Sequence, residues 1–205
     1  MRTASLSLLT ILYLMLAVAP AMASYSNGPY NGTTDAWTIN FGFTVSDSFT
    51  LSGGTVSSFH FVYWDASASD LLTTADLQLD TTSFGGSART VAFSNTFLGT
   101  NQYGYNLYQA DATGLFIPWS GGAGYVTLSN ACSTSGCSVS NPIYWDENSG
   151  PSTAYANTVG SIPSEAFTLG GCGGDCGPPI PEPSSILLFG SGILGLGGVL
   201  RRRLF

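Results

Sequence analysis

The feature that most constrains the fold is the alternation of apolar and polar side chains along several segments of the chain. In the clearest case the apolar positions are Trp37, Ile39, Phe41, Phe43 and Val45. Because side chains of a β-strand point alternately to opposite faces, this pattern predicts a half-buried strand. Other segments of this kind are residues 49–51, 77–79, 91–93, 103–107, 115–119, 126–128, 143–145 and 167–169.

Residues 59–64 differ, because apolar or aromatic side chains occupy both alternating sets of positions. Phe59, Phe61 and Tyr63 form one set, and His60, Val62 and Trp64 form the other. We therefore predict a central strand that is covered on both faces.

Glycine pairs at residues 53–54, 85–86 and 121–122 are typical of turns between strands. About ten short strands, with no convincing helical stripe, predict an all-β fold, namely an antiparallel β-sandwich or jelly roll. Only residues 70–77 could form a helical turn.

The chain ends in an uncharged apolar segment at residues 184–200, which follows Pro181-Glu182-Pro183 and precedes Arg201-Arg202-Arg203. As a helix this segment would be roughly 25 Å long, at the short end of what crosses a bilayer. Arginines beside a span stay on the cytoplasmic side, which places the preceding body outside. A buried C-terminal helix of a soluble domain is the alternative, but it would not need three terminal arginines. We therefore expect a single C-terminal transmembrane helix.

This order of Pro-Glu-Pro, short apolar span and arginine cluster resembles the PEP-CTERM sorting signal of Gram-negative bacteria. The resemblance implies recognition by an exosortase, an integral-membrane cysteine transpeptidase, and cleavage near Pro-Glu-Pro. It implies that the inner membrane holds the protein in transit, before release to the cell surface or extracellular matrix. The sorting residues would be Pro181, Glu182, Pro183, Arg201, Arg202 and Arg203.

The start of the chain has the pattern of a secretory signal peptide, with Arg2, an apolar stretch at residues 6–19 and Ala21-Met22-Ala23. We predict cleavage between Ala23 and Ser24. The expected organisation is a signal peptide at 1–23, an exported β-sandwich domain at 24–170, a Gly/Pro/Cys linker at 171–180 and the sorting signal at 181–205.

The formal net charge is −7, there is no lysine, and Arg89 is the only basic side chain between the signal peptide and the tail apart from His60. An acidic body without basic patches argues against nucleic acid and anionic lipid as partners. It is compatible with cations or neutral glycans. An acidic surface that keeps the protein soluble outside the cell is the simpler interpretation.

The four cysteines occur as Cys132 with Cys137 and Cys172 with Cys176. Their spacing is compatible with a zinc site, but an exported protein favours disulfides. We predict the two local pairs, and cross-pairing or free thiols remain as alternatives. Loops this short constrain little chain, so the bridges would contribute little to the core.

Residues that could carry chemistry are few. His60 is the single histidine and fits a core or surface position better than a catalytic base. Asp146, Glu147 and Asn148, taken as a loop, carry oxygens of the kind that Ca²⁺ binds, although turn and capping roles are the alternative. Adjacent carboxylates on a strand would point to opposite faces, so a hydrolase would need a partner from elsewhere. No other cofactor is expected.

Exposed aromatic side chains could stack on sugar rings, and the candidates are Trp64, Tyr103, Tyr105, Trp119 and Trp145. Most of them would be core residues, because aromatic side chains bury large areas.

The body also resembles a recurrent, uncharacterised β-rich domain of PEP-CTERM exported proteins, in residues 37–51, 101–105, 144–150 and 160–167. From these observations we expect a non-enzymatic surface or matrix protein with a structural or adhesive role, associated with exopolysaccharide. The alternatives are a carbohydrate-binding module and, less favoured, a secreted hydrolase.

Overall fold

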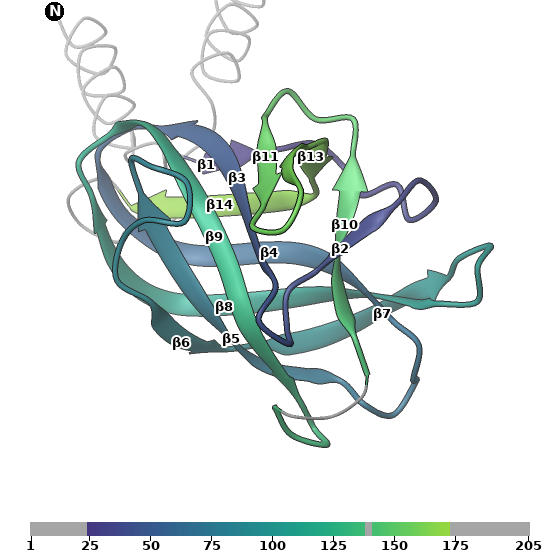
Figure 1. Cartoon of the computed structure of the whole chain (residues 1–205). Coiled ribbons are helices and arrows are strands. Elements are labelled where there is room, and N and C mark those ends of the chain that lie inside the picture. Colours follow the sequence, from purple (N-terminus) through teal and green to yellow (C-terminus); the bar gives the residue numbers. More distant parts are fainter. Residues whose placement is uncertain (1–23, 138–140, 173–205) are drawn as a thin grey trace, which may run out of the picture. The chain divides into compact units, whose positions relative to one another are not determined.

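The computed structural model describes residues 24–137 and 141–172, which form two antiparallel sheets and are consistent with a β-sandwich (Figure 1). Sheet 1 contains β1 (Ser24–Ser26), β2 (Ala36–Thr38), β4 (Gly54–Asp65), β7 (Ser94–Thr100), β8 (Asn106–Trp119), β10 (Ile143–Asn148), β13 (Ser164–Glu165) and β14 (Phe167–Cys172). Sheet 2 contains β3 (Thr44–Leu51), β5 (Leu72–Asp80), β6 (Arg89–Ala92), β9 (Gly122–Ser133), β11 (Ala154–Ala156) and β12 (Gly160–Ile162). The all-β prediction is confirmed for this part of the chain.

Strand β4 is the centre of sheet 1. One of its edges pairs with β8 along its whole length, from Gly54 opposite Trp119 to Asp65 opposite Asn106. The other edge is shared, because β14 pairs with its first part and β10 with residues 63–65. The prediction that this strand is central is therefore confirmed.

The two faces of β4 are both covered, as the alternation predicts. Phe59, Phe61 and Tyr63 point into the core between the sheets and are almost fully buried. On the outer face Val62 and Trp64 are also buried. Among the described residues, this outer face of β4 carries the side chains from which the candidate sites are built.

The prediction of one continuous strand over residues 37–45 is wrong. β2 ends at Thr38, a turn follows in which the Phe43 N–H donates to the Asn40 carbonyl (3.0 Å), and β3 begins at Thr44 in the other sheet. Phe41 has a φ of 57° and is 44% exposed. The buried Asn40 explains the break, because its side chain accepts a hydrogen bond from the Ile143 N–H and donates one to the Asn141 carbonyl, which ties the turn to β10.

Residues 70–77 form no helical turn, because β5 begins at Leu72 and pairs with both β6 and β9. Leu72, Ala75 and Leu77 are fully buried there. Pairing on both edges makes the strand the favoured conformation for this ambiguous segment.

Cys132 and Cys137 form a disulfide at the end of β9, as predicted. Cys172 ends β14, so that strand extends two residues past the predicted domain end at Gly170. Its predicted partner Cys176 lies outside the described residues, as do the signal peptide, most of the linker, the span and the sorting residues. Within residues 24–137 and 141–172, no helix has the length and apolar character needed to cross a membrane.

Candidate functional site

Two pockets open near the outer face of β4. The first, the aromatic pocket, is lined by Trp64, Tyr103, Tyr105, Tyr144 and residues 34–36, and has a volume of about 330 Å³. The second, the polar pocket, lies farther back along β4 around His60 and Val62 and has a volume of about 350 Å³. Because His60, Val62 and Trp64 alternate along one strand, both pockets belong to the same face.

The rings of the aromatic pocket pack against one another. Trp64 stacks on Tyr103, with ring centroids 5.9 Å apart and an interplanar angle of 27°. Tyr105 lies 5.8 Å from Trp64 and meets Tyr144 edge to face at 5.7 Å. Tyr103 is 55% exposed, so its ring offers an apolar surface to an incoming ligand.

Hydrogen bonds and strand register fix the inner wall of this pocket. Trp64 is the register partner of Tyr144 across the β4–β10 pair. The Trp64 indole N–H donates to the Asp146 carboxylate, which also accepts from the backbone N–H groups of Asn31 (3.0 Å) and Gly32 (2.9 Å). Burial raises the pKa of Asp146 to about 6, and these three donors oppose that shift.

The outer wall comes from the loop that joins β7 to β8. The Asn101 side-chain oxygen accepts from the N–H groups of both Tyr103 and Tyr105, at 3.0 Å each. Gly104 has a φ of 85°, a conformation that favours glycine and allows this tight turn. The Tyr103 hydroxyl then donates to the Thr33 carbonyl at 3.0 Å, which joins the loop to the segment before β2. Tyr103 is therefore held in place although it is exposed.

Asp35 is the only carboxylate among the residues that line the aromatic pocket. Its side chain is exposed and accepts from the Ala36 N–H at 2.8 Å, and its carbonyl accepts from the Glu147 N–H at 3.1 Å. The pocket thus combines four aromatic rings with one solvated negative charge.

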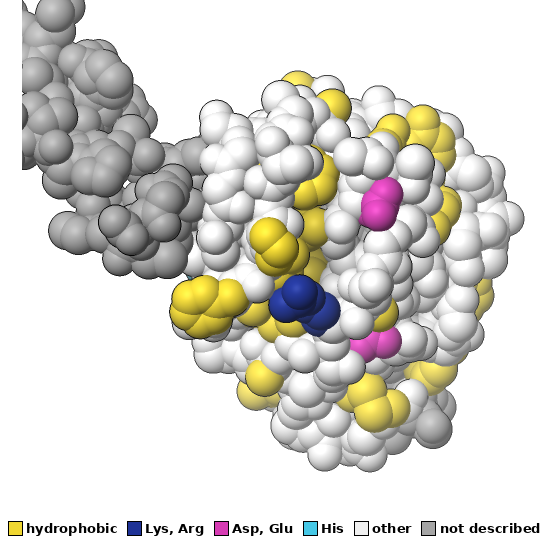
Figure 2. All heavy atoms as spheres, turned by 90° about the vertical axis from the view of Figure 1, so that its left-hand side faces the viewer, with side chains coloured by type: hydrophobic (Ala, Val, Ile, Leu, Met, Phe, Trp, Pro, Cys, Tyr) yellow, Lys and Arg dark blue, Asp and Glu magenta, His cyan; other side chains and the backbone are white. Residues whose placement is uncertain are grey.

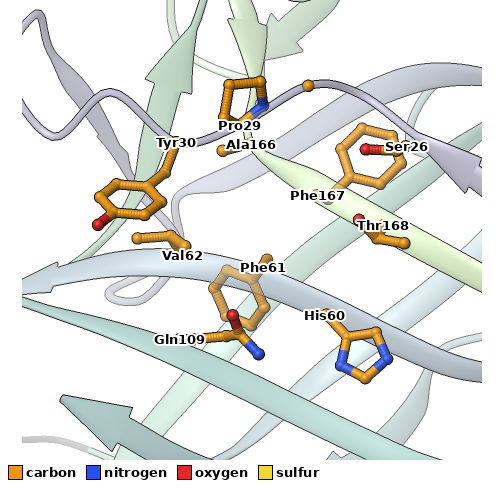
Figure 3. Close-up of a pocket in the computed structure, with 11 residues that line it drawn as sticks. Ser26, Pro29, Tyr30, His60, Phe61, Val62, Gln109, Ala166, Phe167 and Thr168 are labelled. Carbon is orange, nitrogen blue, oxygen red and sulfur yellow. The ribbon is translucent and has the colours of Figure 1, made fainter. Parts of the chain in front are cut away.

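The polar pocket contains the single histidine. His60 Nδ1 lies 2.6 Å from Asp111 Oδ1, which also accepts from the Gln109 side-chain amide at 2.7 Å. Figure 3 shows Tyr30 and His60 at opposite ends of this pocket, with Gln109 from β8 between them. This group of side chains suits hydrogen bonding to hydroxyl or carbonyl groups. Because Asp111 engages Nδ1, the other ring nitrogen is left for a ligand.

The sorting signal of the protein lies in a different part of the chain. Residues 179–203 match the PEP-CTERM protein-sorting motif. The chain carries a PEP-CTERM sorting signal. The match confirms the predicted resemblance and includes all six predicted sorting residues, Pro181 to Pro183 and Arg201 to Arg203. A PEP-CTERM signal implies export, passage through the membrane and processing by an exosortase. A comparison with curated proteins finds no match.

In the body that precedes this sorting signal, the structure separates the five aromatic candidates. It brings Trp64, Tyr103 and Tyr105 together, whereas Trp119 and Trp145 are buried core residues. Tyr144 and Asp35 complete the pocket and were not among the predicted residues. Tyr144 immediately precedes Trp145 in a segment that alternates, and this pattern places it on the outer face.

The predicted calcium ligands do not form a loop. Asp146, Glu147 and Asn148 lie in β10, with Asp146 bonded to Trp64 and Glu147 to the indole N–H of Trp37 (3.2 Å). Successive side chains of a strand diverge, so the three cannot surround one ion. In the part of the chain that the structure describes, no three His, Cys, Asp or Glu side chains are grouped as a metal site requires.

Sequence reasoning missed a buried polar cluster at the edge of the core. The Asn27 amide nitrogen lies 3.0 Å from Asp47 Oδ2 and 2.7 Å from the Glu165 carbonyl, and the Glu165 N–H donates to Asp47 at 2.7 Å. Asp47 and Glu165 are both fully buried, and neither carboxyl oxygen of Glu165 has a partner among the described residues. Acidic side chains are rarely fully buried, so the residue type alone predicts that Asp47 and Glu165 lie on the surface.

Proposed function

We propose that this protein is an exported glycan-binding component of the cell surface or extracellular matrix of a Gram-negative bacterium. Its role is structural or adhesive, and its body contacts exopolysaccharide through the aromatic pocket. The observation that carries this proposal is the group of four aromatic rings that line a pocket of about 330 Å³ on the outer face of β4. The sorting motif supports it, since it directs the body to the compartment where such polymers occur.

The chemistry of the pocket suits a sugar ring. The apolar faces of pyranose rings pack on aromatic side chains, and such contacts add to the area that is buried. The tyrosine hydroxyls and the Asp35 carboxylate supply polar groups for the hydroxyls at the ring's edge. Rigidity favours binding, because the hydrogen bonds of Asn101 and Asp146 fix the rings before a ligand arrives.

We propose binding without catalysis. Glycoside hydrolysis needs two carboxyl groups facing each other across the scissile bond. In the aromatic pocket Asp35 has no second carboxylate among the lining residues, and Asp146 is held by Trp64 behind the wall. Incubation with a polysaccharide that the protein binds should release no new reducing ends, and a time-dependent release would favour the hydrolase.

Replacing Tyr103 or Tyr105 with alanine should weaken binding to such a polysaccharide roughly three- to ten-fold, because each change removes one stacking surface. The measurement is isothermal titration calorimetry with the full chain in detergent. The matched control is Phe116→Ala, which removes an aromatic ring that is 71% exposed but lies outside the pocket. Equal losses in the control and the pocket variants would contradict the assignment.

Processing gives a second test. Mature protein should begin at Ser24, lack residues 186–205 and leave the membrane fraction, as intact mass and fractionation would show. Glu182→Ala should leave unprocessed protein in the inner membrane, because it removes the only charge between the two prolines of the motif. Asp175→Ala, a neighbouring acid outside the matched residues, should be processed normally. If wild type and Glu182→Ala both stay full-length beside an exosortase, the tail is an ordinary anchor.

A further inference from the structure

We propose that the aromatic pocket recognises a positively charged group, the protonated amine of an amino sugar within the glycan. This inference rests on the proposed function and names the class of sugar that the pocket selects. It follows from the kind of side chains that line the pocket and from the distribution of charge over the described residues.

The rings provide the first part of the argument. Aromatic faces carry negative electrostatic potential and attract cations that lie over them, and groups of such rings bind ammonium groups. Trp64, Tyr103, Tyr105 and Tyr144 come from two sheet strands and one hairpin loop, and they line one pocket. Trp64 meets Tyr103 and Tyr105 at angles of 27° and 41°, and Tyr105 meets Tyr144 at 84°. The rings therefore line the pocket at several different angles.

The second part is the negative charge around these rings. Asp35 lines the pocket, and Asp146 receives the indole N–H of Trp64 from behind. Glu147 lies beside them on β10, and its N–H donates to the Asp35 carbonyl. A neutral glycan gains little from the charge of the Asp35 carboxylate that lines the pocket, whereas an ammonium group is attracted by it.

The third part is the position of the opposing charge. Of the twelve acidic residues all but Asp175 and Glu182 lie in the described part of the chain, whose only Lys or Arg is Arg89. Arg89 donates to the Phe116 carbonyl, near where β8 pairs with Val56 of β4. Val56 and Trp64 are eight residues apart on β4, about 26 Å along the strand. Figure 2 shows a dark blue basic side chain on a face of mostly neutral and hydrophobic groups, with acidic side chains, in magenta, nearby.

The test compares three oligosaccharides of equal length, namely hexamers of glucosamine, N-acetylglucosamine and glucose with the same linkage. Calorimetry uses the full chain in detergent at mildly acidic pH, where the sugar amine is protonated. We expect the glucosamine hexamer to bind on the order of ten-fold more tightly than the other two. Added salt should reduce this preference, because Asp35 is exposed and its attraction is screened.

Asp35→Asn should remove a large part of the preference for the glucosamine hexamer over the two neutral hexamers, because it removes the charge while the amide oxygen can still accept from the Ala36 N–H. The matched control is Asp80→Asn. Asp80 lines a different pocket with Trp119, which pairs with Gly54 at the far end of β4. A control that loses the preference equally would show that net charge, not the pocket, attracts the amine, and would overturn the inference. Equal binding of all three hexamers would overturn the charge recognition and leave glycan binding intact, whereas no binding of any hexamer would overturn both.

Discussion

Replacing Trp145 with alanine is expected to lower the free energy of unfolding by about 3–5 kcal/mol. Trp145 is 0% exposed and packs edge to face against three core rings, with centroids 6.2 Å from Phe59, 5.8 Å from Phe61 and 5.7 Å from Phe167. Its indole N–H donates to the Ala166 carbonyl at 3.0 Å. The alanine variant would leave a large cavity where β10, β4 and β14 meet, and the Ala166 carbonyl would keep only its hydrogen bond from the Val62 N–H (3.4 Å).

Urea denaturation followed by circular dichroism would measure this loss, with Phe116→Ala as the control. That ring is 71% exposed, so its removal should change stability by no more than about 0.5 kcal/mol. If Trp145→Ala cost as little as the control, the aromatic cluster between the sheets would not be the main source of stability.

Local sequence predicts the strands well where one face or both faces are buried. β4 is predicted as central because its two alternating sets are both apolar, and burial on two faces is what the structure has. The same rule failed at residues 37–45, where alternation continues through a turn. Phe41 and Phe43 there are 44% and 40% exposed, and the chain changes sheets because of contacts that Asn40 makes with residues about 100 positions away.

The aromatic pocket shows why a site is harder to predict than a strand. Trp64 and Trp145 look alike in the sequence, because each is preceded by a tyrosine and followed by an aspartate. They lie on opposite faces of sheet 1, and only the register of β4 with β10 decides which of them lines the pocket. Asp35 joins the site through a strand pairing that local sequence does not specify. The sorting signal needs no such pairing, because its parts are recognised in linear order.

The protein is expected to be more stable at about pH 4 than at neutral pH, and Glu165 is the main cause. Burial raises the pKa of Glu165 well above its usual range, and the nearby charge of Asp47 raises it further. Burial also raises the pKa of Asp47 and of Asp146 to about 6 in each case. These carboxyl groups bind protons more tightly in the folded protein than in the unfolded chain. Their contribution is therefore complete below the unfolded pKa of about 4 and is lost as the pH rises through the folded values.

Glu165→Gln separates this effect from the rest of the fold. At about pH 4 the wild-type carboxyl is protonated and resembles the amide, so the two proteins should have similar stability. At neutral pH the wild type must either keep a proton that the unfolded chain releases or bury a charge without a partner, since neither carboxyl oxygen has one among the described residues. The variant should then be more stable by roughly 1–3 kcal/mol, and its stability should fall less steeply with pH.

Urea denaturation at a series of pH values would test this, with Asp80→Asn as the control. Asp80 is an acidic side chain at the end of β5, and its carboxylate accepts from the Thr82 N–H at 3.0 Å, so its pKa is lowered, in the opposite direction to that of Glu165. The control should follow the wild-type profile above pH 4. Two results would contradict this prediction: a wild type that gains stability between pH 4 and 7, or parallel curves of stability against pH for wild type and Glu165→Gln. In either case Glu165 would be ionised in the folded protein at little cost. Either result would mean that the cluster of Asn27, Asp47 and Glu165 is open to water rather than part of the core.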